Sequence, residues 1–159
     1  MNGRRSGRLS VAGMIAMPHG SRTRLCHRLV RHPAGDGKRR SMGEKGSIAL
    51  YEGVQHLIEV PIVLVWNRLG THVSRRIRKL IERREWLTVF LLPACSPDLN
   101  SVEPVWAQVK HSLAGLADVA LGRLKVLVRN RLERLRCRPG LLGGFVGGTG
   151  FAFDSPTPR

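Results

Sequence analysis

The chain has 159 residues, the length of a single domain, and its 42% hydrophobic and 24% charged residues are typical of a globular protein. Its net charge of +16 predicts a polyanionic partner such as nucleic acid. No stretch approaches the ~20 apolar residues of a transmembrane helix, so we expect no membrane partner. Cys26, Cys95 and Cys137 lie far apart without metal-ligand spacing. This pattern favours neither a disulfide framework nor a zinc site and fits a cytoplasmic protein.

The N-terminal third predicts two strands and a loop. Residues 7–18, "GRLSVAGMIAMP", read as a strand that Pro18 stops. Residues 21–30 alternate apolar and basic side chains, the pattern of a half-exposed antiparallel partner. Residues 31–46 are rich in glycine, lysine and arginine and predict a loop.

The middle of the chain alternates helix and strand. We expect a helix from 47 to 59 with Ser47 as its N-cap, and then the buried strand Ile62–Trp66. An amphipathic helix over 71–86 and a second buried strand over 87–93 follow.

The last third predicts two helices and a glycine-rich tail. The loop after Pro93 leads to a helix over 102–116, for which Asn100 or Ser101 serves as the N-cap. Residues 117–136 form the last predicted helix, and residues 140–159 are too rich in glycine to order except by docking. The whole order is an antiparallel hairpin feeding a βαβ unit, which predicts an α/β fold with a mixed sheet.

Two polar residues follow the predicted parallel strands at the same sheet edge. Asn67 comes directly after the first strand, and Glu103 lies in the first turn of the helix that follows the second. Their oxygen atoms suit a hard cation such as Mg²⁺. The alternative is that Asn67 only turns the chain and that Glu103 is an acid favoured by the helix dipole.

The segments "VLVWNRLGTH" and "LTVFLLPACSPDLNSVEPVWAQVK" resemble the catalytic half of bacterial insertion-sequence transposases of the Tc/mariner superfamily. The match runs from about Arg8 to Gly150. The resemblance implies a ribonuclease H-like fold, in which three carboxylates hold two Mg²⁺ or Mn²⁺ ions for DNA cleavage and strand transfer. We therefore expect residues 8–150 to form a partial domain of this kind and residues 151–159 to be a disordered tail.

The resemblance also implies a damaged site. Glu103 corresponds to the third carboxylate, and Asn67 takes the place of the second, normally aspartate. The first belongs on a strand before residue 9, where residues 1–8 contain no acid. We also expect this chain to lack the family's N-terminal helix-turn-helix region. We therefore expect an N-terminally truncated fragment whose absent central strand leaves an edge exposed, unless a separate fragment or another transposase copy supplies it.

The charge lost at Asn67 is large enough to decide activity. A unit charge facing a divalent ion at 2–3 Å is worth on the order of 10 kcal/mol gross at an effective dielectric of ~20. A net loss of ~3 kcal/mol would weaken metal binding roughly a hundredfold. We therefore expect an enzyme by descent that is catalytically dead, with weak or lost metal binding.

Basic residues on two helices are the candidate DNA contacts. His72 and Lys110 match basic positions of the family, and Arg75, Arg76 and Lys79 form the polar side of the 71–86 helix. The alternative for the 71–86 helix is a solvated basic face without DNA contact. For the chain as a whole, the alternatives to a transposase fragment are a non-catalytic basic DNA-binding or oligomerisation module and an unrelated basic protein that mimics the signature.

Overall fold

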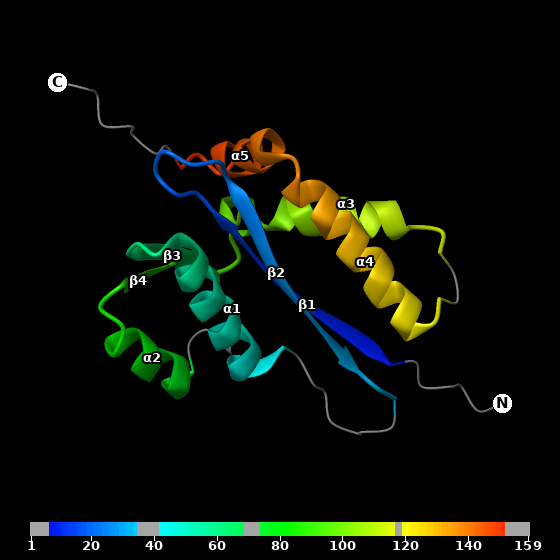
Figure 1. The fold of residues 1–159 in the computed structure, drawn as a ribbon, viewed down its shortest axis with the longest axis horizontal. Coiled ribbons are helices and arrows are strands. Elements are labelled where there is room, and N and C mark those ends of the chain that lie inside the picture. The colour runs from blue at the N-terminus through cyan, green and yellow to red at the C-terminus, as the bar shows by residue number, and fades with distance from the viewer. Residues whose placement is uncertain (1–6, 35–41, 69–73, 117–118, 152–159) are drawn as a thin grey trace.

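The computed structural model describes residues 7–34, 42–68, 74–116 and 119–151 (Figure 1).

An antiparallel hairpin runs through the middle of the molecule. Strand β1 (Arg8–Ala16) pairs with β2 (Arg24–His32) along its whole length. The turn between them carries a hydrogen bond from Ser21 N to Pro18 O of 3.2 Å. The predicted hairpin is therefore confirmed.

The second sheet is a parallel pair built from a βαβ unit. Helix α1 (Gly43–Ile58) leads into β3 (Ile62–Trp66), and α2 (Arg75–Glu82) returns the chain to β4 (Leu87–Leu91). Strands β3 and β4 are parallel and in register from Ile62 opposite Leu87 to Trp66 opposite Leu91. The predicted crossover is confirmed, and Ser74 caps α2 by accepting a hydrogen bond from Ile77 N.

The mixed sheet expected from the sequence occurs as two separate sheets. Among the described residues, β1 pairs only with β2 and β3 only with β4. The α/β class is confirmed, and the antiparallel and parallel parts are both present. They are not joined because no described strand lies between β1 and β3 to pair with both.

Three C-terminal helices cover one side of the hairpin (Figure 1). A short 3-10 helix η1 (Pro97–Leu99) precedes α3 (Glu103–Leu113), and α4 (Leu121–Arg136) and α5 (Pro139–Gly147) follow. Their apolar side chains form the first core with β2. The buried members of this core are Leu25, Val105, Val109, Val128, Leu132, Leu135 and Leu142.

Helix α5 lies in the glycine-rich segment that was expected to order only by docking. Leu142 is fully buried in the first core, and Val146 is 6% exposed. Burial of these two side chains supplies the stabilisation that a helix with four glycines lacks by itself. The predicted disordered tail lies, from residue 152 on, outside the described residues.

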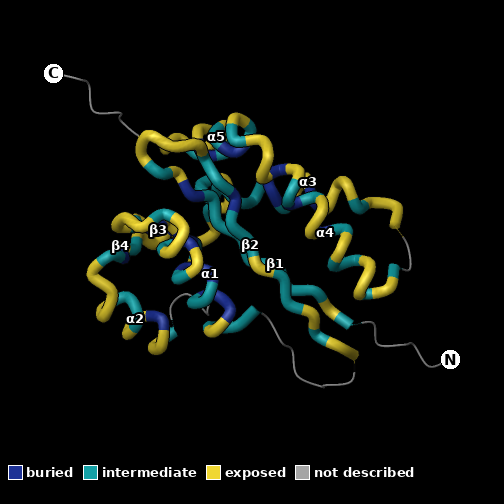
Figure 2. The backbone as a smooth tube through the Cα atoms, viewed as in Figure 1, coloured by how far each residue is buried: buried dark blue, intermediate teal, exposed yellow. Residues whose placement is uncertain are grey.

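A second core lies on the other side of the hairpin, between α1, α2 and the parallel sheet. Its buried members are Tyr51, Leu64, Trp66, Ile77 and Leu87. The rings of Tyr51 and Trp66 lie 5.3 Å apart at a tilt of 58°. Exposed residues nevertheless run along β3 and β4 (Figure 2). Within the described residues, no helix has both the length and the apolar run needed to cross a lipid bilayer.

All four predicted helices begin at other residues than expected. Helix α2 starts at Arg75 instead of residue 71, and α3 starts at Glu103 instead of residue 102. Helix α1 starts at Gly43, so Ser47 is not its N-cap. The Ser47 hydroxyl is buried and donates to Gly43 O at 3.3 Å, which satisfies it inside the helix. Helix α4 starts at Leu121 instead of residue 117.

Candidate functional site

Asn67 lies at the carboxyl edge of the parallel sheet. Two contacts fix the chain around it. Leu92 N donates to Trp66 O at 2.7 Å, which extends the β3–β4 ladder by one bond. The guanidinium Nε of Arg68 donates to Leu92 O at 3.4 Å. Asn67, between these anchored residues, is partly buried, and this is the position at which open α/β sheets place their ligands.

Glu103 is the first residue of α3, and Asn100 holds it in place. The Asn100 side-chain Nδ2 donates to Glu103 Oε1 at 3.2 Å, and its Oδ1 accepts from Val102 N at 3.3 Å. The backbone N of Glu103 also donates to Asn100 O at 3.0 Å. The predicted capping role of Asn100 therefore takes this form, although the N-cap position itself is occupied by Val102.

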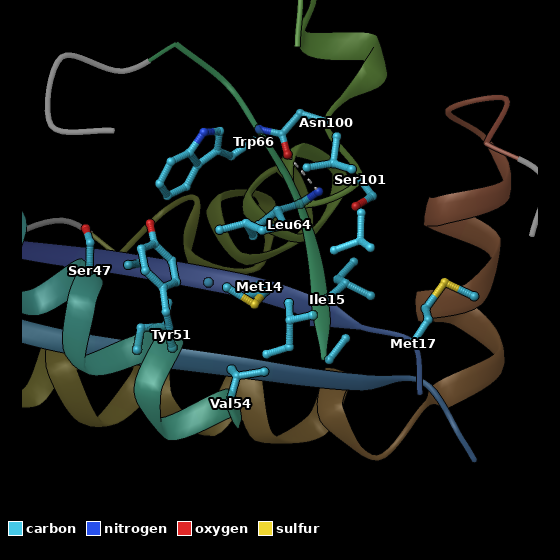
Figure 3. A pocket seen from close by; sticks show the side chains of 18 of the residues that line it. Met14, Ile15, Met17, Ser47, Tyr51, Val54, Leu64, Trp66, Asn100 and Ser101 are labelled. Carbon is cyan, nitrogen blue, oxygen red and sulfur yellow. Dashed lines mark hydrogen bonds between the residues drawn. The ribbon is translucent and has the colours of Figure 1, made fainter. Parts of the chain in front are cut away.

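Both candidate ligands line one cavity. It has a volume of about 1050 Å³, and Asn67, Asn100 and Glu103 form part of its wall. The rest of the lining is mainly apolar and comes from β1, α1 and β3 (Figure 3). Both residues that the sequence paired therefore lie in the lining of one largely apolar cavity.

The donor set around Asn67 and Glu103 does not fit a two-metal site. It offers one carboxylate and one amide, whereas two divalent ions held by protein oxygens need several carboxylates. In the part of the chain that the structure describes, no three acidic, histidine or cysteine side chains lie close enough to hold a metal ion. Asp98 is exposed in η1, and Asp36 lies outside the described residues.

The predicted DNA-contacting residues lie on two elements. Arg75, Arg76 and Lys79 are exposed on α2, and Lys110 is exposed on α3. His72 lies outside the described residues. The α2 side chains therefore form one basic surface that is open to a polyanion.

A second basic surface was missed by the reading of the sequence. On α4, the exposed cations are Arg123, Arg129, Arg134 and Arg136. Helices α2 and α4 lie on opposite sides of the hairpin, so the two basic surfaces are well separated (Figure 1). The signal was present in "VRNRLERLR", where arginines recur at helical spacing between the leucines of the core face.

A family model matches part of the sequence, and two solved structures are similar to the fold. Residues 47–119 match the family model of DDE superfamily endonucleases. The structure is similar to that of the Mos1 transposase paired-end complex with left transposon end, with a TM-score of 0.54 and 14% identity over 95% of this chain and 57% of that chain. The Mos1 strand transfer complex gives a TM-score of 0.52 at 14% identity, over 95% of this chain and 56% of that one.

The similarity confirms the ribonuclease H-like fold that the sequence predicted. This chain spans a little over half the length of the Mos1 chains, at 57% and 56%. No curated protein matches it.

Proposed function

We propose that this chain, whose residues 47–119 match the DDE superfamily endonuclease model, is a transposase-type domain that binds DNA without cutting it. The observation that carries the proposal is that Asn67 and Glu103 line one cavity, where Glu103 is the sole carboxylate among the lining residues that the structure describes. An amide keeps a carbonyl ligand but removes the negative charge that a divalent ion requires.

The DNA part of the proposal rests on charge and on exposure. The net charge is +16, and the cations on α2, together with Lys110, are exposed. Phosphate contacts by such side chains give salt-dependent, sequence-independent affinity. The fold is shared with a transposase whose solved structures are complexes with transposon DNA.

The domain, its surroundings and its metal binding follow from the same family resemblance. Residues 8–150 form the domain, of Tc/mariner type, and it works in the cytoplasm beside DNA and another transposase copy. Mg²⁺ or Mn²⁺ binds weakly, because the described lining of the cavity offers one carboxylate. The chain is thus a partial transposase domain, inherited from an insertion sequence, that retains DNA binding and has lost DNA cleavage.

A nicking assay tests the loss of cleavage. Supercoiled plasmid is incubated with the purified chain and Mg²⁺ or Mn²⁺, beside the Glu103→Gln variant. We expect no nicking above that of the variant. Metal-dependent nicking that Glu103→Gln abolishes would show that the chain is an active nuclease and would refute this part of the proposal.

Metal affinity tests the role of Asn67 separately. We expect Asn67→Asp to bind Mn²⁺ roughly a hundredfold more tightly than the unmodified chain in calorimetry, which corresponds to ~3 kcal/mol. Adding Glu103→Gln should remove that gain, because both side chains border the same cavity. Equal Mn²⁺ affinity for the chain with Asn67 and with aspartate would mean that this position holds no ligand.

Gel shifts at several salt concentrations test the DNA contacts. The triple variant Arg75→Ser, Arg76→Ser and Lys79→Ser should reduce the slope of log K against log salt by about three, since each phosphate contact contributes ~0.9. The matched control variant replaces three exposed α4 arginines, Arg123, Arg129 and Arg134, with serine. It should leave the slope of log K against log salt unchanged. A chain that shifts no DNA even at low salt would exclude DNA binding altogether.

A further inference from the structure

Strand β4 forms the outer edge of the parallel sheet. Among the described residues its sole strand partner is β3, so no described strand pairs with its second edge. Residues 62–66 of β3 line the large cavity, whereas residues 87–91 of β4 do not. The outer edge of β4 therefore lies on the far side of β3 from the cavity and from the hairpin (Figure 1).

The ladder between β3 and β4 determines which backbone groups point outward. Ile62 N donates to Trp86 O at 2.6 Å at one end, and Leu92 N donates to Trp66 O at 2.7 Å at the other. Successive residues of a strand direct their N–H and C=O groups to alternate sides. The even-numbered residues from 86 to 92 therefore bond to β3, and the odd-numbered residues point away from it.

Three residues of β4 present backbone groups at this outer edge. Val89 and Leu91 present both the N–H and the C=O group. Leu87 presents its C=O group, because Leu87 N already donates to Arg84 O at 3.0 Å. Backbone donors and acceptors in a row are the template for an added strand.

The strand lacks the side chains that usually block such pairing. Natural edge strands are protected by charged residues or by proline. Residues 86–97 contain no charged residue, although 24% of the chain is charged, and no proline lies within β4. Phe90 and Leu91 are instead 58% and 43% exposed. The outer edge of β4 is therefore apolar and uncharged.

We propose that this edge pairs with the same edge of a second copy of the chain, antiparallel about a twofold axis at Val89. The two Val89 residues then exchange both of their backbone hydrogen bonds, as directly opposed residues do in an antiparallel ladder. Leu91 N of each copy donates to the Leu87 C=O group of the other. Both outward N–H groups of each strand thus obtain an acceptor.

The same register pairs the exposed side chains of β4. Phe90 lies opposite Thr88 of the other copy, and Leu91 lies opposite Leu87. Pairs of an aromatic and a β-branched side chain stabilise neighbouring strands. The contact therefore covers both of the large apolar side chains that β4 exposes in the single chain.

Charge makes this edge a suitable contact between two copies. Each copy carries a net charge of +16, so two basic surfaces such as those of α2 or α4 would repel each other. The uncharged β4 strands avoid that local repulsion. The inference rests on the proposed function for its choice of a second copy as the partner, and it requires neither DNA nor metal.

Sedimentation equilibrium of the full chain without DNA or metal tests the inference. We expect a monomer–dimer equilibrium that tightens as NaCl rises from about 0.1 to about 0.5 M, because salt screens the repulsion between the copies. DNA binding weakens over the same range of salt. Self-association and DNA binding can therefore fail independently of each other.

Two variants of β4 and one matched control locate the contact. Phe90→Lys brings like charges together across the axis, and Val89→Pro removes an N–H group that β3 does not use. Each should raise the dissociation constant of the dimer at least about tenfold. Val126→Lys, at a 52% exposed position of α4, should leave it unchanged. Circular dichroism checks that all three variants fold.

Amide exchange followed residue by residue tests the register. The amides of Val89 and Leu91 should gain protection as the protein concentration rises. Protection that does not depend on concentration would overturn the proposal and assign the edge to a segment of the same chain. A monomer at every concentration, a dimer that dissociates as salt rises, or a dimer that the β4 variants weaken no more than Val126→Lys does would also overturn it.

Discussion

Asn100 Nδ2 donates a hydrogen bond of 3.2 Å to Glu103 Oε1, so the only carboxylate at the cavity beside Asn67 among the described residues is held by a neutral amide. The same Asn100 side chain accepts from Val102 N at 3.3 Å. One residue thus satisfies the first turn of α3 and orients its acid. The position of Glu103 is therefore maintained by helix capping, with no metal needed.

Asn100→Ala should lower the free energy of unfolding by about 1 kcal/mol, because it removes an acceptor for Val102 N and the donor to Glu103. Urea unfolding followed by circular dichroism measures the change. Ser101→Ala is the control, since the Ser101 side chain makes neither bond. An unchanged midpoint for Asn100→Ala would mean that α3 does not need this cap.

Gly13→Ala should destabilise the chain by about 1–3 kcal/mol through overpacking. A Cβ atom at Gly13 would lie 2.7 Å from Cη2 of Trp106, so β1 and α3 would have to separate. Gly53→Ala on α1 is the matched control, because a Cβ there meets nothing within 4 Å. It should stabilise the chain by roughly 0.5–1 kcal/mol. Thermal unfolding of both variants distinguishes close packing from helix propensity.

Acidification should destabilise the chain through His27. Burial lowers the pKa of His27 below 6.5, and the positive charges of Arg136 and Arg129 act in the same direction. The Glu133 carboxylate, whose Oε1 lies 3.8 Å from His27 Nε2, raises this pKa but does not offset the burial. The unfolded state therefore binds the proton first as the pH falls. The stabilisation is complete above pH 6.5 and is lost as the pH falls through the lowered pKa of the folded state.

Thermal midpoints between pH 8 and pH 5 check this direction. His27→Gln should flatten the decline, whereas His56→Gln, at an exposed position of α1, should keep it. A decline that is equally steep in His27→Gln would assign the pH dependence to another group.

Leu142→Ala should lower the free energy of unfolding by about 2–5 kcal/mol, because the Leu142 side chain is fully buried in the first core. The neighbouring Leu141 is only partly buried against that core. Leu141→Ala should therefore lower the free energy of unfolding by less than Leu142→Ala does. Chemical denaturation of the two variants compares them. Equal and small losses would show that α5 contributes little to the fold.

The sequence predicted most elements because their patterns are local. Alternation over residues 21–30 predicted β2, and the apolar run at Ile62–Trp66 predicted β3. The start of α2 was wrong, because the helix was expected from residue 71 and Ser74 is its N-cap. The start of α1 was wrong because Ser47 can bond either forward as a cap or back to Gly43 O, and only packing decides between them.

The site was predictable in its location and less so in its surroundings. The edge of a parallel sheet predicted that Asn67 and Glu103 would face one site, and both residues line the same cavity. The basic side of α4 was visible in the sequence as arginines at helical spacing. The apolar lining of the cavity depends on how β1, α1 and β3 pack together, which a one-dimensional pattern does not encode. Helix α5 is the same kind of case, because glycine-rich sequence becomes helical only where Leu142 is buried.

The two hydrophobic cores have a consequence for how the chain folds. The second core is built from one continuous segment, α1 to β4, whereas the first joins β2 near the start of the chain to α3, α4 and α5 near its end. Closing the longer loop costs more entropy, so the inner segment can form before the outer layer is assembled around it. Unfolding should begin with the separation of β2 from α3, α4 and α5 in the first core. The βαβ segment should be the last cooperative unit to lose its order.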